Sequence, residues 1–124
     1  MTPDPVRVGL VGAGYFARLH LDAWRRLDGA RLVAVCDRDP ATHAHVESAD
    51  ERIPVYRDVA TMLDAEELHL VDIATPPDTH LSLAADATAR GLDIICQKPL
   101  APTREDAARL VEECENGGVE ISTR

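Results

Sequence analysis

The chain alternates between short apolar runs and longer segments in which apolar residues recur every three or four positions. The first apolar run covers 6–11, is rich in β-branched residues and is followed at once by glycines in a tight turn, which is typical of a buried strand of a parallel sheet. The segment 15–27 then places His20, Trp24 and Leu27 at helical spacing. The two patterns together predict a strand, a tight turn and a helix.

The same alternation continues to the end of the chain. Further strands, each an apolar or β-branched run beside turn-forming residues, are predicted at 31–36, 55–56, 68–74, 94–96 and 119–122. Helices are predicted between them, in the early forties, at 59–63, up to 90 and up to about 115. N-caps are expected at Asp58, at Asp78 or Thr79, and at Thr103, which has Asp106 at the spacing of a capping box.

This order of elements predicts a single α/β domain over 1–124. Strands that alternate with helices build a doubly wound parallel sheet with helices on both faces, joined by right-handed crossovers. We therefore expect a Rossmann fold of three layers with about six strands. Ligands of such sheets bind outside the carboxyl ends of the strands, where the strand order reverses. The turn motifs of this chain fall at those ends.

The composition and net charge of the chain disfavour several classes of binding partner. The chain has 124 residues and a formal net charge of −9, which disfavours nucleic acid and anionic membranes as partners, because both require a basic patch. No segment stays apolar over the roughly 20 residues of a membrane span, and no signal-peptide pattern is found, so the expected location is cytoplasmic. The three cysteines lack a Cys-x-x-Cys spacing and are expected to be buried thiols, without a metal site.

A dinucleotide-binding motif follows the first predicted strand. Gly12, Gly14 and Ala17 fit the Gly-x-Gly-x-x-Gly/Ala fingerprint. Its small residues allow a tight turn, close approach of a pyrophosphate and close packing of helix on strand. The backbone N–H groups near Gly14, Tyr15 and Phe16 are expected to bind the phosphates at the positive end of the helix.

Asp37 stands at the end of the second predicted strand, about twenty residues past the glycines. An acidic side chain there can accept hydrogen bonds from the adenosine ribose hydroxyls and would repel a 2′-phosphate. A plain turn into Pro40 is the alternative interpretation of the residue. The neighbouring Arg38 could stack on adenine or pair with a 2′-phosphate. NAD is therefore the favoured cofactor, and NADP stays open.

Lys98 is the single lysine of the chain and follows an apolar strand at the same edge of the predicted sheet. A lysine that loses solvent there can relay a proton or bind a hydroxyl, and a solvated surface lysine is the alternative. Response-regulator receivers carry a similar threonine and Lys-Pro pair, here matched by Thr75 and Lys98-Pro99. That class is rejected, because Gly12 stands where its first acidic residues belong and the third strand offers only a displaced Asp58.

Several linked motifs resemble the N-terminal domain of the oxidoreductase family named for glucose-fructose oxidoreductase, inositol dehydrogenase and MocA. The resemblance runs through the whole chain, and its motifs lie at 8–14 with Ala17, at 35–37, at 71–80 and at 97–101. It implies that Thr75 and Pro76 pass near the nicotinamide half of the cofactor, with His80 opening the next helix. These three residues are therefore candidate cofactor-binding residues.

The motif at 97–101 carries the catalytic residue of the family. Gln97 replaces the family's glutamate, which keeps a hydrogen bond and loses a charge, and the resemblance places it near the nicotinamide ribose. The same resemblance assigns Lys98 to the catalytic contact with the reacting hydroxyl of the substrate. It also implies a cis bond between Lys98 and Pro99.

The resemblance implies an NAD(P)-dependent oxidoreductase that acts on the CH–OH group of a sugar, cyclitol or related polyol, with hydride transfer to nicotinamide. The family's second α/β domain, which supplies most of the substrate pocket, has no counterpart here. We therefore expect a fragment, a truncated gene product or half of a split enzyme, inactive alone and able to use a substrate only with a second domain. The alternatives are a non-catalytic dinucleotide-binding or sensor module that needs a partner, and a degenerate fold without ligand. The oligomeric state is open.

Overall fold

The computed structural model describes residues 4–12, 17–39, 41, 46 and 52–123, with the backbone alone for 17–21. Six strands of this described part form one sheet in the spatial order β3-β2-β1-β4-β5-β6, and every pair of neighbours is parallel. The strands are β1 (Val6–Val11), β2 (Ala30–Cys36), β3 (Val55–Tyr56), β4 (Leu70–Ile73), β5 (Asp93–Cys96) and β6 (Ile121–Thr123). This is the strand order of a doubly wound Rossmann fold, and the predicted fold class is confirmed.

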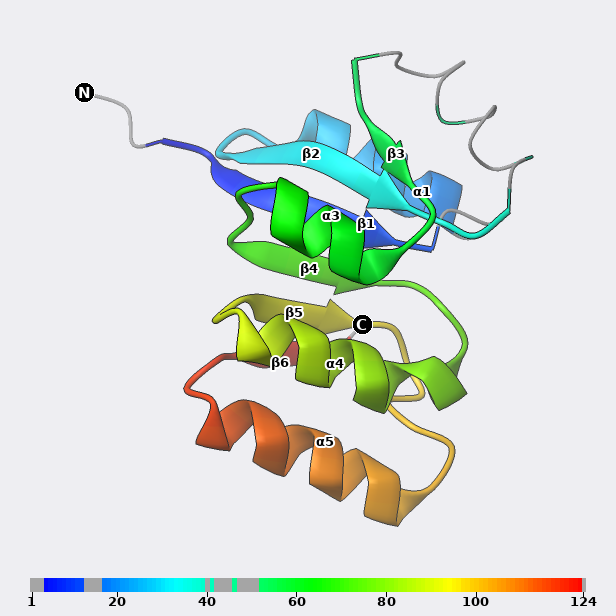
Figure 1. Ribbon diagram of the computed structural model, residues 1–124, viewed down its shortest axis with the longest axis vertical. Helices are drawn as coiled ribbons and strands as arrows, with labels where there is room; N and C mark the ends of the chain where they lie inside the picture. The colour runs from blue at the N-terminus through cyan, green and yellow to red at the C-terminus, as the bar shows by residue number, and fades with distance from the viewer. Residues whose placement is uncertain (1–3, 13–16, 40, 42–45, 47–51, 124) are drawn as a thin grey trace.

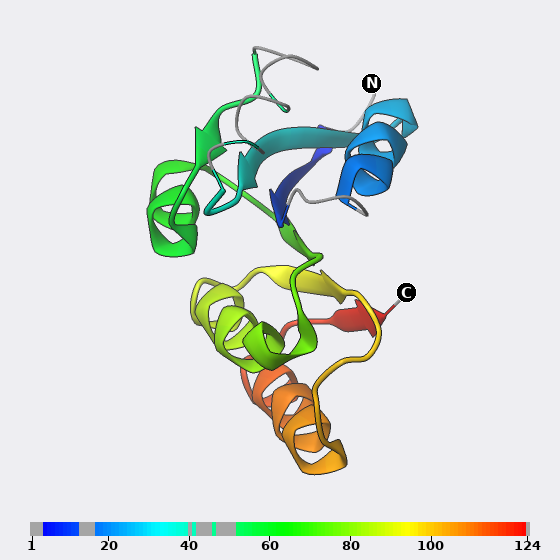
Figure 2. The same cartoon turned by 90° about the vertical axis from the view of Figure 1, so that its right-hand side faces the viewer.

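Helices cover both faces of the sheet. One face carries α1 (Ala17–Arg26), and the other carries α3 (Val59–Ala65), α4 (His80–Ala89) and α5 (Arg104–Asn116) (Figure 1). Figure 2 shows α1 and α3 on opposite sides of the strands. The larger apolar core lies under α3, α4 and α5, and the smaller one packs around Trp24 of α1.

Two helix starts follow the predicted caps. The Asp58 carboxylate accepts a hydrogen bond of 3.0 Å from the Thr61 backbone N–H at the start of α3. The Thr103 hydroxyl accepts one of 3.1 Å from the Asp106 N–H at the start of α5. Each bond satisfies a backbone donor that the first turn of a helix leaves without an intrahelical partner. The capping predictions for Asp58 and Thr103 are therefore confirmed.

The predicted cap of α4 is wrong. A 3₁₀ turn, η1 (Pro77–Thr79), precedes α4 and contains Asp78, so the chain has already turned before the helix begins. Thr79 occupies the N-cap position, but its side chain makes no capping bond. Its hydroxyl instead donates to the Pro76 carbonyl at 2.6 Å, and a second bond of 2.6 Å joins it to the Thr75 hydroxyl. Thr79 therefore shapes the loop before α4.

Other differences from the predicted elements are local. Leu27 was expected to continue the apolar face of the first helix, but α1 ends at Arg26 and Leu27 is 53% exposed. The apolar run at 68–74 shortens to β4, and the last strand begins two residues later than predicted, at Ile121. The helix predicted in the early forties falls mostly outside the described residues.

Candidate functional site

A cavity of ≈ 620 Å³ opens at the carboxyl ends of β1, β2 and β4. Its lining brings together predicted site residues that lie far apart in the sequence, namely Gly12, Asp37, Arg38, Thr75 and Pro76. The strand order reverses between β1 and β4, and this reversal is where doubly wound sheets bind their ligands. The sheet topology alone therefore indicates that a ligand would bind in this cavity.

Gly12 makes a close approach that only glycine permits. Its φ angle is +92°, and a Cβ atom at this position would lie 2.9 Å from Thr75 Cγ2 and 3.1 Å from the Ala74 carbonyl oxygen. The Gly12 N–H donates to the Cys36 carbonyl at 2.8 Å. The ends of β1, β2 and β4 are thereby held close together. The predicted phosphate contacts at Gly14, Tyr15 and Phe16 lie outside the described residues and stay predictions.

Asp37 both forms a turn and lines the cavity. One carboxylate oxygen accepts a hydrogen bond of 2.8 Å from the Asp39 N–H, and the Asp37 N–H donates to the Tyr56 carbonyl at 2.8 Å. The turn interpretation is therefore correct for this oxygen, and it is compatible with a ligand role because Asp37 and Arg38 also face the cavity. The turn orients the carboxylate at the end of β2.

Several polar residues that line this cavity were not predicted as site residues from the sequence. Cys36, Arg57, Asp58, Asp78, Ser82 and Asp86 also contribute to its lining. Burial raises the pKa of the Cys36 thiol to about 11, with further contributions from Asp58 and Asp37, so the thiol is neutral at neutral pH. Arg57 and Asp58 follow directly after β3, and this position at a strand end was the signal that could have identified them.

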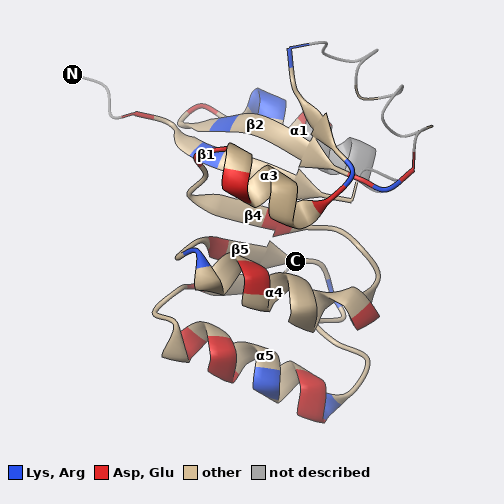
Figure 3. Cartoon of the chain, in the orientation of Figure 1, with Lys and Arg blue, Asp and Glu red and all other residues tan. Residues whose placement is uncertain are grey.

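Charge around the cavity is mixed. Acidic side chains occur along α3, α4 and α5 (Figure 3), whereas the cavity itself also receives Arg38 and Arg57. The hydrogen bonds from the Thr61 hydroxyl and N–H lower the pKa of Asp58, which stays ionised beside these arginines. An anionic ligand here would depend on the two guanidinium groups and on backbone N–H donors.

His80 lies beneath the cavity. The side chain is 1% exposed and does not contribute to the cavity lining. Its Nε2 lies 2.7 Å from the Thr75 carbonyl oxygen, its Nδ1 lies 2.9 Å from the Leu100 carbonyl oxygen, and the Cys96 sulfur lies 3.0 Å from Nδ1. The ring thus contacts backbone on two different loops, which the sequence did not indicate.

Gln97 and Lys98 lie in the loop after β5 and are not among the residues that line the cavity. The Gln97 N–H donates to the Ile73 carbonyl at 3.1 Å, which continues the pairing of β5 with β4. The Lys98–Pro99 peptide bond is cis, as the family resemblance implied. Lys98 is exposed, so the chain does not by itself supply the solvent-poor environment considered for this lysine.

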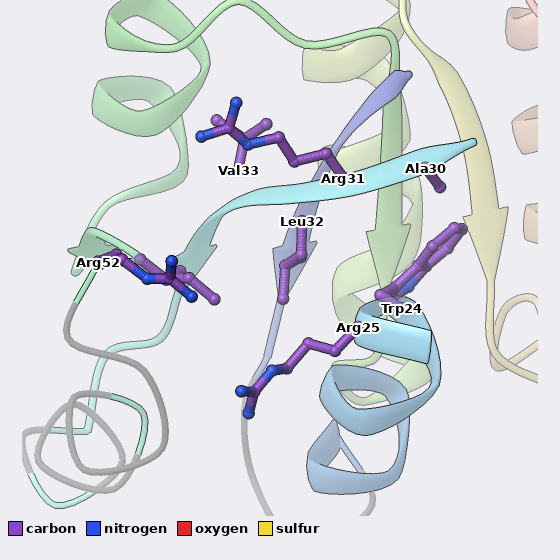
Figure 4. A pocket seen from close by; sticks show the side chains of 8 residues that line it. Trp24, Arg25, Ala30, Arg31, Leu32, Val33 and Arg52 are labelled. Carbon is purple, nitrogen blue, oxygen red and sulfur yellow. The ribbon is translucent and has the colours of Figure 1, made fainter. Parts of the chain in front are cut away.

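A second cavity, of ≈ 490 Å³, lies between the last turn of α1 and β2 (Figure 4). Arg25, Arg31 and Arg52 line it, beside Trp24 and Leu32. Leu32 points to the opposite side of β2 from Arg31 (Figure 4), as the alternation of a strand requires. None of the predicted site residues that the structure describes lines this second cavity.

None of the helices in the described part of the chain is long and apolar enough to cross a membrane. The same residues include no group of three or more His, Cys, Asp or Glu side chains that could hold a metal ion.

A glycine turn and an acidic residue at adjacent strand ends of a parallel sheet define a dinucleotide-binding Rossmann domain. Residues 6–124 match the family described as "Oxidoreductase family, NAD-binding Rossmann fold". The chain therefore belongs to this family, named for glucose-fructose oxidoreductase, inositol dehydrogenase and MocA, and residues 6–124 match its NAD-binding domain. The cavity residues fit NAD, because Gly12 lines the cavity without a side chain and Asp37 contributes an acidic acceptor to the lining at the end of β2.

Curated relatives include sugar and cyclitol dehydrogenases. A D-apiose dehydrogenase of Paraburkholderia graminis is 46% identical over 112 residues, which cover 90% of this chain and 30% of that protein. Inositol 2-dehydrogenase 4 of Saccharopolyspora erythraea is 37% identical over 113 residues, which cover 90% of this chain and 33% of that protein. The chain thus spans about a third of the length of these relatives.

Solved structures share the fold closely. An oxidoreductase from Agrobacterium radiobacter, in complex with NAD⁺, L-tartaric acid and magnesium, has a TM-score of 0.91 and 34% identity, over 96% of this chain and 35% of that one. The WlbA dehydrogenase from Bordetella pertussis, in complex with NADH and UDP-GlcNAcA, has a TM-score of 0.91 and 30% identity, over 100% of this chain and 36% of that one. Both neighbours were solved with a nicotinamide dinucleotide.

Proposed function

We propose that this chain is the cofactor-binding part of an oxidoreductase that oxidises the CH–OH group of a sugar, cyclitol or related polyol. The convergence of Gly12, Asp37 and Thr75 on one cavity at the carboxyl edge of the sheet carries the proposal. The names of the relatives, D-apiose dehydrogenase and inositol 2-dehydrogenase, support a polyhydroxylated substrate. NAD, when bound, would accept the hydride.

The residues at the strand ends have distinct proposed roles. The Asp37 carboxylate would accept hydrogen bonds from the adenosine ribose and repel a 2′-phosphate, which favours NAD over NADP. Gly12 would allow the dinucleotide to approach the backbone, with phosphate contacts at Gly14, Tyr15 and Phe16. Thr75 and Pro76 would lie along the nicotinamide half of the cofactor.

Lys98 is the proposed catalytic residue, with Gln97 near the nicotinamide ribose. The lysine would bind the hydroxyl that is oxidised and assist the departure of its proton. In this chain Lys98 is exposed, and a second domain would have to cover it and supply the substrate pocket. We therefore expect little or no turnover by the 124-residue chain alone.

A cytoplasmic location is also proposed. Cys36, Cys96 and Cys114 are all free and buried. Disulfides are rare in reducing compartments, and buried thiols that lack them are the usual pattern there. The net charge of −9 further argues against nucleic acid as a partner.

Titration calorimetry of the chain with NAD⁺ and NADP⁺ tests the cofactor assignment. The Asp37→Asn variant keeps an oxygen that accepts from the Asp39 N–H but removes the charge beside the ribose. We expect a loss in NAD⁺ affinity of roughly tenfold to a hundredfold, from the strength of hydrogen bonds to charged groups, and a smaller preference over NADP⁺. Asp39→Asn is the matched control, since its carboxylate accepts from the Ala41 N–H and does not line the cavity.

Each result of the calorimetry bears on the assignment. Equal affinities for NAD⁺ in the Asp37 and Asp39 variants would contradict the ribose contact. Absence of binding to both dinucleotides in the unsubstituted chain would contradict the proposed cofactor site as a whole.

A graft tests the catalytic step. Residues 6–124 would replace the matching part of the Paraburkholderia graminis D-apiose dehydrogenase, which is 46% identical. The formation of NADH with D-apiose as the substrate would be followed by the absorbance of the reduced nicotinamide. Lys98→Met should abolish turnover and leave NAD⁺ binding intact, whereas Arg109→Met on α5 is the control for loss of a cation. Activity retained in Lys98→Met would contradict the catalytic role of Lys98, whereas a graft that binds NAD⁺ but never turns over D-apiose, even with Lys98 present, would favour a non-catalytic binding module.

A further inference from the structure

The ring of His80 lies between two loops of the proposed site. One loop follows β4 and contains Thr75 and Pro76, which line the cavity. The other follows β5 and carries Lys98. The Nε2 atom of His80 lies 2.7 Å from the Thr75 carbonyl oxygen, and Nδ1 lies 2.9 Å from the Leu100 carbonyl oxygen. The two ring nitrogens therefore lie within hydrogen-bond distance of the backbone of both loops.

The segment that carries Lys98 has few hydrogen bonds that could replace the contact between His80 and Leu100. Gln97 N–H bonds to the Ile73 carbonyl, and Thr103 caps α5. Between these two anchors, the bond from His80 to Leu100 is the one hydrogen bond that the described residues provide for the segment 98–102. His80 is 1% exposed, so water cannot readily replace a lost donor.

Whether Nδ1 carries a proton decides whether the ring can bond to the Leu100 carbonyl. A carbonyl oxygen only accepts hydrogen bonds, so each ring nitrogen must carry a proton to bond its own carbonyl. A ring with its single proton on Nε2 holds the Thr75 loop only. Its bare Nδ1 can then accept from the Cys96 thiol, whose sulfur lies 3.0 Å away. The Leu100 loop is held only when Nδ1 carries a proton.

We propose that His80 is a positioning residue for Lys98: its Nδ1–H holds the Leu100 carbonyl and thereby fixes the lysine loop to the start of α4. The functional value of this contact rests on the proposed role of Lys98. His80 would act through the backbone of the loop, because its own side chain is buried outside the cavity lining.

Two amide substitutions separate the two hydrogen bonds. The side-chain nitrogen of asparagine can take the place of Nδ1, and that of glutamine can take the place of Nε2. His80→Asn therefore retains a donor toward Leu100, and His80→Gln retains one toward Thr75. His80→Leu removes both donors. His69→Leu, at an exposed position just before β4, is a control for the loss of a histidine outside the site.

The sequence provides a selective probe, because Lys98 is its only lysine. Labelling the 124-residue chain with ¹⁵N-lysine yields one backbone amide signal in a two-dimensional NMR spectrum. We expect a rigid amide, with an order parameter of about 0.85, in the unsubstituted chain, in His80→Asn and in His69→Leu. In His80→Gln and His80→Leu the order parameter should fall below about 0.6, and the signal should move.

The pattern across the variants decides the proposal. An unchanged Lys98 signal in all variants, or a change in His80→Asn as large as that in His80→Gln, would overturn it. Should His80→Leu fail to fold, the comparison of the asparagine and glutamine variants still tests the assignment. The spectra contain no dinucleotide, so a failure to bind NAD⁺ would contradict the proposed function without changing the result of this test.

Discussion

The indole Nε1 of Trp24, in α1, donates a hydrogen bond of 2.7 Å to Oδ2 of Asp72, in β4. Both side chains are buried, with exposed fractions of 7% for Trp24 and 0% for Asp72. A buried carboxyl group is costly unless hydrogen bonds compensate for the lost water. The indole therefore supports an acidic side chain in the middle of the sheet and joins the first helix to a central strand.

Replacement of Trp24 by Phe should destabilise the chain. Phenylalanine keeps most of the ring but removes the donor to Asp72, so the free energy of unfolding should fall by about 2 kcal/mol. Urea unfolding followed by circular dichroism measures the change. Asp72→Asn is the comparison, because it keeps an acceptor for the indole and should cost less. A loss in Trp24→Phe no larger than the error of the fit would contradict a role for this bond.

The crowding at Gly12 can be separated from its backbone conformation. Gly12 and Gly29 both have positive φ angles, +92° and +84°, but only a Cβ at Gly12 has neighbours within 4 Å. Alanine at either position should cost about 1–2 kcal/mol of stability for the backbone conformation. Only Gly12→Ala should also weaken NAD⁺ binding, by at least about tenfold, because its methyl group would displace Thr75. Equal NAD⁺ affinities in the two variants, measured by calorimetry, would count against the close approach.

The buried thiols predict a loss of stability at high pH. Burial raises the pKa of Cys36 to about 11 and that of Cys96 to about 12, from an ordinary value of 9.0. A raised pKa in the folded state means that stability is complete below the ordinary value and is lost as pH rises toward the folded value. Unfolding by urea should therefore become easier from about pH 9 upward. Cys36→Ala should reduce this dependence, and a thiol reagent at neutral pH should modify the native cysteines far more slowly than the unfolded ones.

The ionised cap at Asp58 leads us to expect a loss of stability as the pH is lowered. Hydrogen bonds from Thr61 lower its pKa from 3.8, so its contribution to stability is present above that value and is lost as pH falls through the folded pKa. Asp58→Asn keeps a capping oxygen but has no proton to take up. The difference in melting temperature between the two proteins should therefore shrink as the pH is lowered below about 4. A difference that stays constant over this range would exclude the ionised cap.

Features that depend only on neighbouring residues were predicted correctly from the sequence, and those that depend on competing hydrogen bonds were not. The strand 55–56 and the caps at Asp58 and Thr103 were predicted correctly, because they depend on residues within a few positions of one another. The cap of α4 was wrong, because Pro77 starts a 3₁₀ turn and Thr79 bonds back to Pro76 and Thr75. Competing side-chain bonds of similar strength leave no distinct signal in a sequence.

Some residues of the candidate site were also predictable from the sequence, and others were not. Gly12, Asp37 and Thr75 could be predicted because each stands where a strand ends, and parallel strands place their carboxyl ends at one edge. The residues that pack under or beside the loops were harder to predict. Nothing local distinguishes a histidine that lines a cavity from one that is buried against backbone carbonyls, as His80 is.

The sequence by itself determined the order of strands and helices, the Rossmann class and the glycine turn, because hydrophobic period and turn chemistry act over short distances along the chain. Only the tertiary structure decided which distant groups meet. It placed the indole of Trp24 on Asp72, the methyl group of Thr75 against Gly12, and the ring of His80 between the Thr75 and Leu100 carbonyls. These contacts join residues that are far apart in the sequence and depend on how the layers pack, and those of His80 use backbone acceptors, which every residue carries and which no sequence pattern marks.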